Sequence, residues 1–160
     1  MRNILTETVF GEKLNQKMTL CEALTLLQEK ELLNAGELAE KAVSIFTGIA
    51  QTSRCQSGYD LINGWEIKHG QTHQLATSST RTAYVAGLKN KTDTIRVIIT
   101  EQFTGKLYFF KIPHCAYIPH AKSSISWSFN KHGTPNRIKT SGTRENFWNY
   151  EVNTFADLCS

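Results

Sequence analysis

The sequence predicts a single-domain α/β fold in which a mixed, antiparallel-rich central sheet is flanked by helices. Helix-type apolar stripes occupy residues 18–51, two adjacent strand-type runs fill residues 93–112, and an alternating run follows at 123–130. A chain of 160 residues is long enough to bury a core without disulfides. We therefore expect one domain over residues 1–160.

Two helices are predicted in the first third of the chain. Residues 18–33 begin with Thr19 and Glu22 in the spacing of a capping box, and leucines recur along one face. Residues 34–51 form the second helix, which Asn34 can cap. The apolar face of this second helix consists of Leu38, Ala42, Ile45, Phe46 and Ile49.

The dipeptide Asn63-Gly64 predicts a β-hairpin over residues 59–68. The loop length decides which side chains share a face, because side chains alternate along a strand. A two-residue loop points Asp60 and Glu66 to opposite faces. A three-residue loop that ends on a left-handed glycine sets Asp60 opposite Glu66. The second register is preferred because it separates the charged side chains from the apolar ones, which are Leu61, Trp65 and Ile67.

In the preferred register Asp60, Glu66 and Lys68 share one face of the hairpin. Two opposed carboxylates repel each other, and a divalent cation would remove this penalty because hard cations take oxygen ligands. The lysine could orient or deprotonate an attacking water beside the ion, and the backbone carbonyl of Ile67 could complete the metal shell. The ordinary alternative is a solvated charged face.

The segment after the hairpin is expected to be a loop followed by a helix. Residues 69–80 are polar and read as a loop. Residues 80–91 are predicted to form a helix with Tyr84, Val85 and Leu88 turned inward.

The last part of the chain is predicted to be rich in strands. Residues 93–112 read as two strands joined near Thr104-Gly105, and the alternation of apolar residues with serines predicts a strand over 123–130. Residues 131–144 read as a loop. Residues 146–159 supply aromatic anchors and a short helix.

The composition is that of a globular protein, with 40% hydrophobic and 20% charged residues. No apolar run approaches the roughly 18 residues that span a bilayer, and the first residues lack the apolar region of a signal peptide. We therefore expect a cytoplasmic protein without a membrane segment. The four scattered cysteines form no CxxC pair and are expected to be reduced thiols.

The basic residues are distributed unevenly along the chain. The net charge is +4, and no carboxylate occurs between Glu101 and Glu145. Such a region favours a polyanionic partner. The basic residues in this gap are Lys106, Lys111, Lys122, Lys131, Arg137, Lys139 and Arg144.

Asp60 followed by Glu66-Ile67-Lys68 resembles the Asp…Glu-x-Lys core of the restriction-endonuclease-like (PD-(D/E)XK) nucleases. The predicted order of helix, hairpin, helix and strand pair over residues 35–112 is similar to that family's core. The sequence departs from the family in two ways. Tyr59 stands where proline is frequent, and the five-residue gap between the acids is at the short end.

The resemblance implies an α/β nuclease that hydrolyses DNA phosphodiesters with Mg²⁺, or with Mn²⁺ in its place. Asp60 and Glu66 would bind the metal, with Ile67 contributing its carbonyl, and Lys68 would assist the nucleophile. Many members add a glutamate from the preceding helix, where the chain offers Glu37 and Glu40, and Glu40 is preferred. These residues are the predicted catalytic and metal-binding set.

Double-stranded DNA is the expected partner, and we predict site-specific cutting of the restriction or homing type. Cutting both strands needs two active sites, so a homodimer is expected. The basic and aromatic part over residues 121–150 would contact the DNA through phosphates and base edges. The predicted DNA contacts are His69, His73, Arg81, Lys131, His132, Arg137, Lys139 and Arg144.

Three alternatives stay open at this point. The chain could be a junction-resolving nuclease, or a non-catalytic nucleic-acid-binding module with incidental hairpin charges. It could also be a zinc-stabilised domain, because His69 and His73 have the spacing of two ligands on a helical turn. Their glycine-containing segment lacks helix character, however, and the "HCAYIPH" segment over residues 114–120 reads as a strand end rather than as a second ligand pair.

Overall fold

The computed structural model describes residues 35–52, 59–72, 80–138 and 145–160. Within these ranges the protein is an α/β fold with a mixed sheet, as the sequence predicts. The predicted helix over residues 18–33 lies outside the described residues. The same is true of the predicted DNA contacts His73, Lys139 and Arg144.

The main sheet has four strands in the order β1-β3-β4-β6. β1 pairs in parallel with β3, and the other two pairs are antiparallel. β3 is buried along its whole length, because it lies between two layers of side chains. The predicted strand pair over residues 93–112 is therefore confirmed. The strands are β1 (Glu66–Gln71), β3 (Ile95–Glu101), β4 (Lys106–Ile112) and β6 (Glu151–Val152).

A second, two-stranded sheet pairs β2 (Thr80–Val85) with β5 (Ile125–Asn130) in antiparallel fashion. The strand predicted over residues 123–130 is confirmed, whereas the helix predicted over 80–91 is wrong. Burial alternates along β2, with Tyr84 exposed. The β-branched residues of "TRTAYV" suit this alternation, since they pack well on a pleated surface.

The helices are few and mostly short. α2 (Ala35–Thr47) confirms the second predicted helix, and α4 (Phe155–Leu158) is the short helix predicted near residue 159. Residues 114–120, expected as a strand end, instead form α3 (His114–Tyr117) and the 3₁₀ turn η2 (Ile118–His120). A further 3₁₀ turn is η3 (Phe147–Tyr150). None of the helices among the described residues combines the length and the apolar character that crossing a membrane requires.

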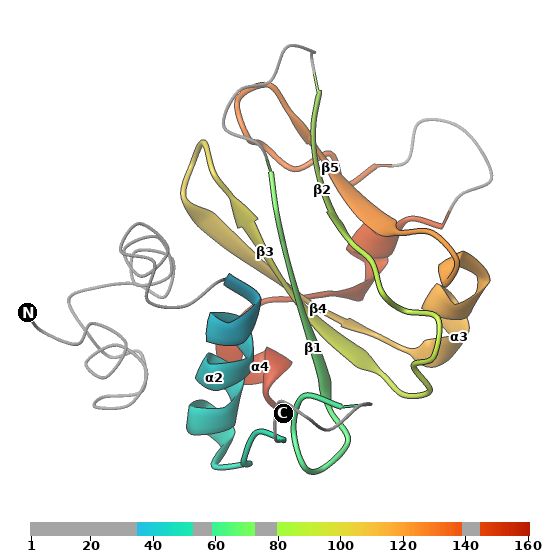
Figure 1. Ribbon diagram of the computed structural model, residues 1–160. Coiled ribbons are helices and arrows are strands. Elements are labelled where there is room, and N and C mark those ends of the chain that lie inside the picture. The colour runs from blue at the N-terminus through green and yellow to red at the C-terminus, as the bar shows by residue number, and fades with distance from the viewer. Residues whose placement is uncertain (1–34, 53–58, 73–79, 139–144) are drawn as a thin grey trace, which may run out of the picture.

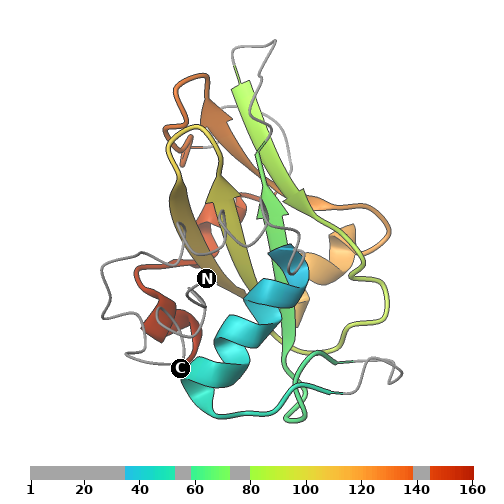
Figure 2. The same cartoon turned by 60° about the vertical axis from the view of Figure 1, so that its left-hand side comes forward.

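The main sheet separates two apolar cores. Figures 1 and 2 show the elements that lie on its two faces. Side chains of α2 and α4 cover one face, where they meet Ile67 and Ile98. The β2–β5 pair, α3 and η3 cover the other face, where they meet Val97 and Ile99. Gly70 lets β2 approach β1 closely, since a Cβ there would lie 2.7 Å from the Tyr84 carbonyl oxygen.

Candidate active site

Asp60 is placed by a tight turn that precedes β1. Gly64 has a φ of +91°, a left-handed conformation that glycine adopts readily, and its N–H donates to the Leu61 carbonyl at 3.0 Å. The Leu61 N–H donates to the Trp65 carbonyl at 3.1 Å. This is the three-residue loop that the sequence predicts, with Leu61 paired to Trp65.

Beyond this turn the predicted hairpin over residues 59–68 is wrong. The backbone around Asp60 pairs with the segment after α2, where the Thr52 N–H donates to the Asp60 carbonyl at 2.9 Å. The N–H of Ile67, which a hairpin partner strand would bind through a carbonyl, donates to Asp60 Oδ2 at 2.6 Å. The aspartate carboxylate thus takes the place of a partner strand at the start of β1.

The main chain of Ile67 is oriented toward the same edge as Asp60. In an extended strand the N–H and C=O of one residue point to the same side, because the residue exchanges both bonds with one neighbour. The Ile67 carbonyl therefore faces the edge of β1 that carries Asp60. The role of this carbonyl as a metal ligand stays a prediction, and the strand geometry allows it.

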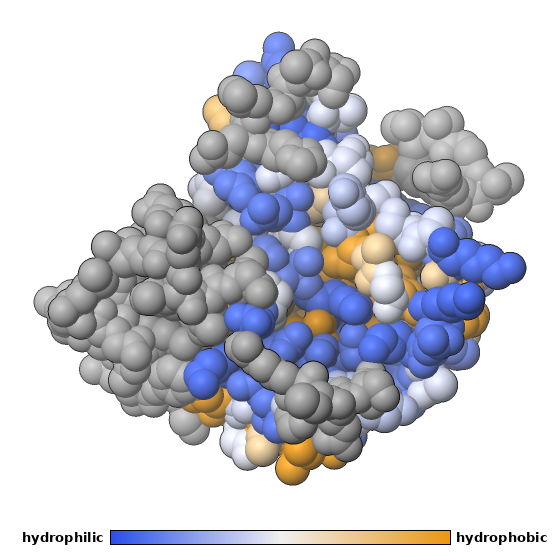
Figure 3. Space-filling view, viewed as in Figure 1, coloured by the Kyte–Doolittle hydropathy of each residue, from blue (hydrophilic) through white to orange (hydrophobic). Residues whose placement is uncertain are grey.

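Glu66 is nearly buried and lies between two lysines. Its side chain is 6% exposed, with Oε1 3.0 Å from Lys68 Nζ and Oε2 3.0 Å from Lys91 Nζ. Oε2 makes no hydrogen bond within the described residues, so this ion pair is its only recorded polar contact there. Hydrophilic side chains gather toward the lower right of the view in Figure 3, near the β2–β3 connection.

Glu40 of α2 completes the acidic group. Burial is the main cause that raises its pKa from 4.5 to about 7, followed by the charge of Asp60, a side-chain hydrogen bond with Asp60, and the charge of Glu66. A hydrogen bond between two carboxyl groups needs one shared proton. The structure therefore places Glu40 beside Asp60 and near Glu66, which pairs with Lys68. The metal-binding and catalytic roles of these residues stay predictions.

The acids are not arranged as a finished metal site. Among the described residues no group of three or more His, Cys, Asp and Glu side chains is placed to hold an ion. The reason is visible in the contacts: Glu66 turns toward its two lysines, while Asp60 turns toward Ile67 and Glu40. A cation would have to compete with Lys91 for Glu66 and displace the proton that Glu40 shares.

The predicted DNA contact at His69 is not supported by its surroundings. His69 Nε2 lies 2.8 Å from Thr100 Oγ1, which places it in a side-chain hydrogen bond on β1 and β3. Burial lowers the pKa of His69 from 6.5 to about 4, so the ring is neutral at pH 7. A neutral, mostly enclosed imidazole is poorly suited to binding phosphate.

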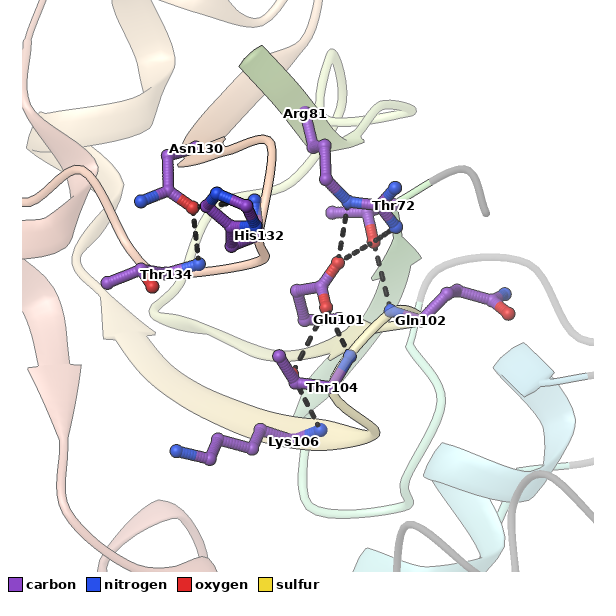
Figure 4. A network of polar contacts seen from close by, with 9 residues as sticks. All are labelled: Thr72, Arg81, Glu101, Gln102, Thr104, Lys106, Asn130, His132 and Thr134. Carbon is purple, nitrogen blue, oxygen red and sulfur yellow. Dashed lines mark hydrogen bonds and ion pairs between the residues drawn. The ribbon is translucent and has the colours of Figure 1, made fainter. Parts of the chain in front are cut away.

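Arg81 is buried and is not available to DNA, so this prediction is corrected. Its Nε lies 2.8 Å from Glu101 Oε1, and a second nitrogen donates to the Thr72 hydroxyl at 3.2 Å (Figure 4). Burial would raise the pKa of Glu101, but hydrogen bonds from Thr104, Thr72 and Arg81 outweigh it, and the pKa is lowered. This ion pair links the two sheets.

Lys131, His132 and Arg137 stay as predicted DNA contacts. The first two are exposed in the turn that follows β5. Arg137 lines an open groove of about 620 Å³ beside Ser126 and Ser128. Its guanidinium makes a bidentate contact with Glu151, with nitrogen–oxygen distances of 3.0–3.3 Å, so phosphate would have to compete with this carboxylate.

The basic turn and the acidic group lie at opposite ends of the main sheet. Glu66 pairs with Ile95 at the start of β3, whereas Gly133 of the turn packs against Glu101 at its end. Six steps along a strand span about 20 Å. This distance corresponds to roughly six base pairs of a duplex. A duplex that contacted both ends would have to extend over at least this length.

Lys91, which could extend the basic surface on sequence grounds, lies beside Glu66, a position that the sequence did not indicate. It comes from the β2–β3 connection, more than twenty residues after Lys68, and belongs to no motif.

Comparison with known proteins identifies no relative. The sequence matches no model of a known protein family, and a search of curated proteins finds no match.

Proposed function

We propose that this protein is a metal-dependent endonuclease that hydrolyses DNA phosphodiester bonds. In chemistry it would resemble the restriction-endonuclease-like nucleases. The single observation that carries the proposal is the convergence of Glu40, Asp60, Glu66 and Lys68, from a helix, a turn and a strand, onto one place. The order of elements gives partial support to the proposal. As in that family, a helix (α2) precedes the motif and a strand pair (β3–β4) follows it. The strand β2 stands where a helix was expected.

The acidic group suits a hard divalent cation such as Mg²⁺ or Mn²⁺. Its donors are all oxygens, which these ions prefer. Glu66 Oε2 is buried and pairs with the Lys91 ammonium at 3.0 Å. The pKa of Glu40 is raised by burial and by the charges of Asp60 and Glu66, which a cation would offset. Asp60, Glu66 and Glu40 would hold the ion. When bound, it would polarise the scissile phosphate and stabilise the negative charge that develops there.

The chain's own residues have separate tasks in the proposed hydrolysis. Lys68 orients the attacking water by hydrogen bonding, and the proton of that water passes to bulk solvent as its oxygen bonds to phosphorus. The phosphorus–oxygen bond to one sugar breaks, and the sugar oxygen takes up a proton from bulk solvent. Asp60 is held in place for this step by the Ile67 N–H. Lys131 and His132 would hold the same duplex about 20 Å away.

The test is cleavage of a supercoiled plasmid by purified protein. We expect nicked and then linear DNA in the presence of Mg²⁺ or Mn²⁺, and intact DNA when a chelator replaces the metal. Discrete fragments from genomic DNA would indicate site-specific cutting, and a smear non-specific cutting. Equal plasmid integrity with metal and with chelator would contradict the proposal.

Two further parts of the proposal follow from the same assay. Two-strand cleavage by one active site per chain requires two chains, so a homodimer is expected when both strands are cut at once. Salt-dependent DNA binding without any cutting would instead favour a non-catalytic binding module, for which Lys131, His132 and Arg137 would be sufficient.

A further inference from the structure

We propose that Lys91 is a second phosphate-binding lysine of the active site, poised on Glu66 until a metal ion takes that carboxylate. This inference rests on the proposed nuclease function and adds to it a residue outside the Asp…Glu-x-Lys motif. The ammonium of Lys91 lies 3.0 Å from Glu66 Oε2, while that of Lys68 lies 3.0 Å from Oε1. The two lysines therefore hold opposite oxygens of one carboxylate.

The backbone places Lys91 there with little freedom. Its N–H donates to the Leu88 carbonyl at 3.2 Å, which closes a turn, and Leu88 is fully buried in the core beneath β2 and β3. Gly87 has a φ of +75°, and a Cβ at this position would lie 3.4 Å from Lys68 Nζ. The connection between β2 and β3 is thus folded closely around the lysine pair.

Partial burial strengthens the electrostatic interaction between Lys91 and Glu66. The side chains of Lys68 and Lys91 are 23% and 19% exposed, and that of Glu66 is 6% exposed. Ion pairs on the open surface contribute little, but charges in a partly dehydrated site interact more strongly. Two ammonium groups so close together are tolerated because the carboxylate lies between them. Another anion must replace that carboxylate when a metal ion binds it.

Among Glu40, Asp60, Glu66, Lys68 and Lys91, the charges match a phosphodiester when Lys91 is counted. Once a metal ion displaces the proton shared by Glu40 and Asp60, the three carboxylates exceed the two lysines by one negative charge. One divalent cation makes the group singly positive, which balances the single negative charge of a scissile phosphate. Without Lys91 the loaded site would be neutral before the phosphate enters. Lys91 therefore supplies the positive charge that the incoming phosphate needs.

The experiment compares Lys91→Ala and Lys91→Arg with wild type and with Lys89→Ala, an exposed lysine of the same connection. Two quantities are measured: the affinity for Mn²⁺ without DNA, and the single-turnover cleavage rate of a bound duplex. For Lys91→Ala we expect a rate lower by on the order of 100-fold. Its Mn²⁺ affinity should equal or exceed that of wild type, because Glu66 loses a competing cation. Lys91→Arg should retain most of the rate, and Lys89→Ala all of it.

The outcomes separate this inference from the nuclease proposal. If wild type cuts DNA and Lys91→Ala cuts at the same rate, the role of Lys91 is overturned and the nuclease proposal stands. If Lys91→Ala loses Mn²⁺ affinity along with its rate, Lys91 merely supports Glu66 structurally, and the inference again fails. If wild type binds Mn²⁺ but cuts nothing, both proposals fall together.

Discussion

Lys68→Ala is expected to lower the Mg²⁺-dependent cleavage rate by about 10²- to 10⁴-fold, the range typical of a lost acid–base group. The Lys68 ammonium is bound to Glu66 at 3.0 Å, so the substitution removes the group to which the proposal assigns the orientation of the attacking water. Folding and duplex affinity in chelator should change little, because Lys91 still neutralises Glu66. The rate is measured under single-turnover conditions, with thermal unfolding as the folding check.

Two companion variants sharpen this prediction. Lys89→Ala removes an exposed lysine from the neighbouring connection and should cut at the wild-type rate. Lys68→Arg keeps the positive charge but cannot give up a proton at neutral pH. Recovery of the rate in Lys68→Arg would assign an electrostatic role to Lys68, and continued loss would assign it proton transfer. Unchanged nicking by Lys68→Ala would remove this lysine from the mechanism.

Arg81→Met is expected to lower the free energy of unfolding by about 3 to 5 kcal/mol. Glu101 is fully buried, and the substitution would leave its charge without the Arg81 guanidinium at 2.8 Å. Gly133 also packs closely against this carboxylate, since a Cβ at Gly133 would lie only 2.5 Å from Oε2. Urea unfolding, followed by circular dichroism, measures the change.

The matched control is Arg137→Met, which removes an arginine from the more exposed ion pair with Glu151 and should change the stability by less than about 1 kcal/mol. If Arg81→Met does not fold, the double variant Arg81→Met with Glu101→Gln should recover part of the stability, because no buried charge remains. Equal effects of Arg81→Met and Arg137→Met would show that the buried pair does not hold the two sheets together.

Part of the acidic group was predictable because a short-range signal carried it. Asn63-Gly64 fixed the turn, and the alternation of side chains along β1 set Glu66 and Lys68 on one face. The backbone pairing of the segment around Asp60 was not predictable in the same way. The backbone around Asp60 pairs with Thr52, a contact that depends on how α2 packs.

Other features depend on contacts between distant parts of the chain. Lys91 reaches Glu66 only because β1 and β3 are parallel neighbours, which brings the connection before β3 to the start of β1. Arg81 was expected to extend the basic DNA-binding surface, yet it pairs with Glu101, twenty residues later. The strand β2 was detectable from its alternation, but its apolar residues were also compatible with a helix.

The most direct test of the central claim is a crystal structure of the protein soaked with Mn²⁺, read by anomalous diffraction. We expect one strong peak in contact with the carboxylates of Asp60 and Glu66, with Glu66 turned away from Lys91. A peak elsewhere, or none at all while Glu66 still binds both lysines, in a protein that cleaves DNA, would contradict a metal centre built from these acids.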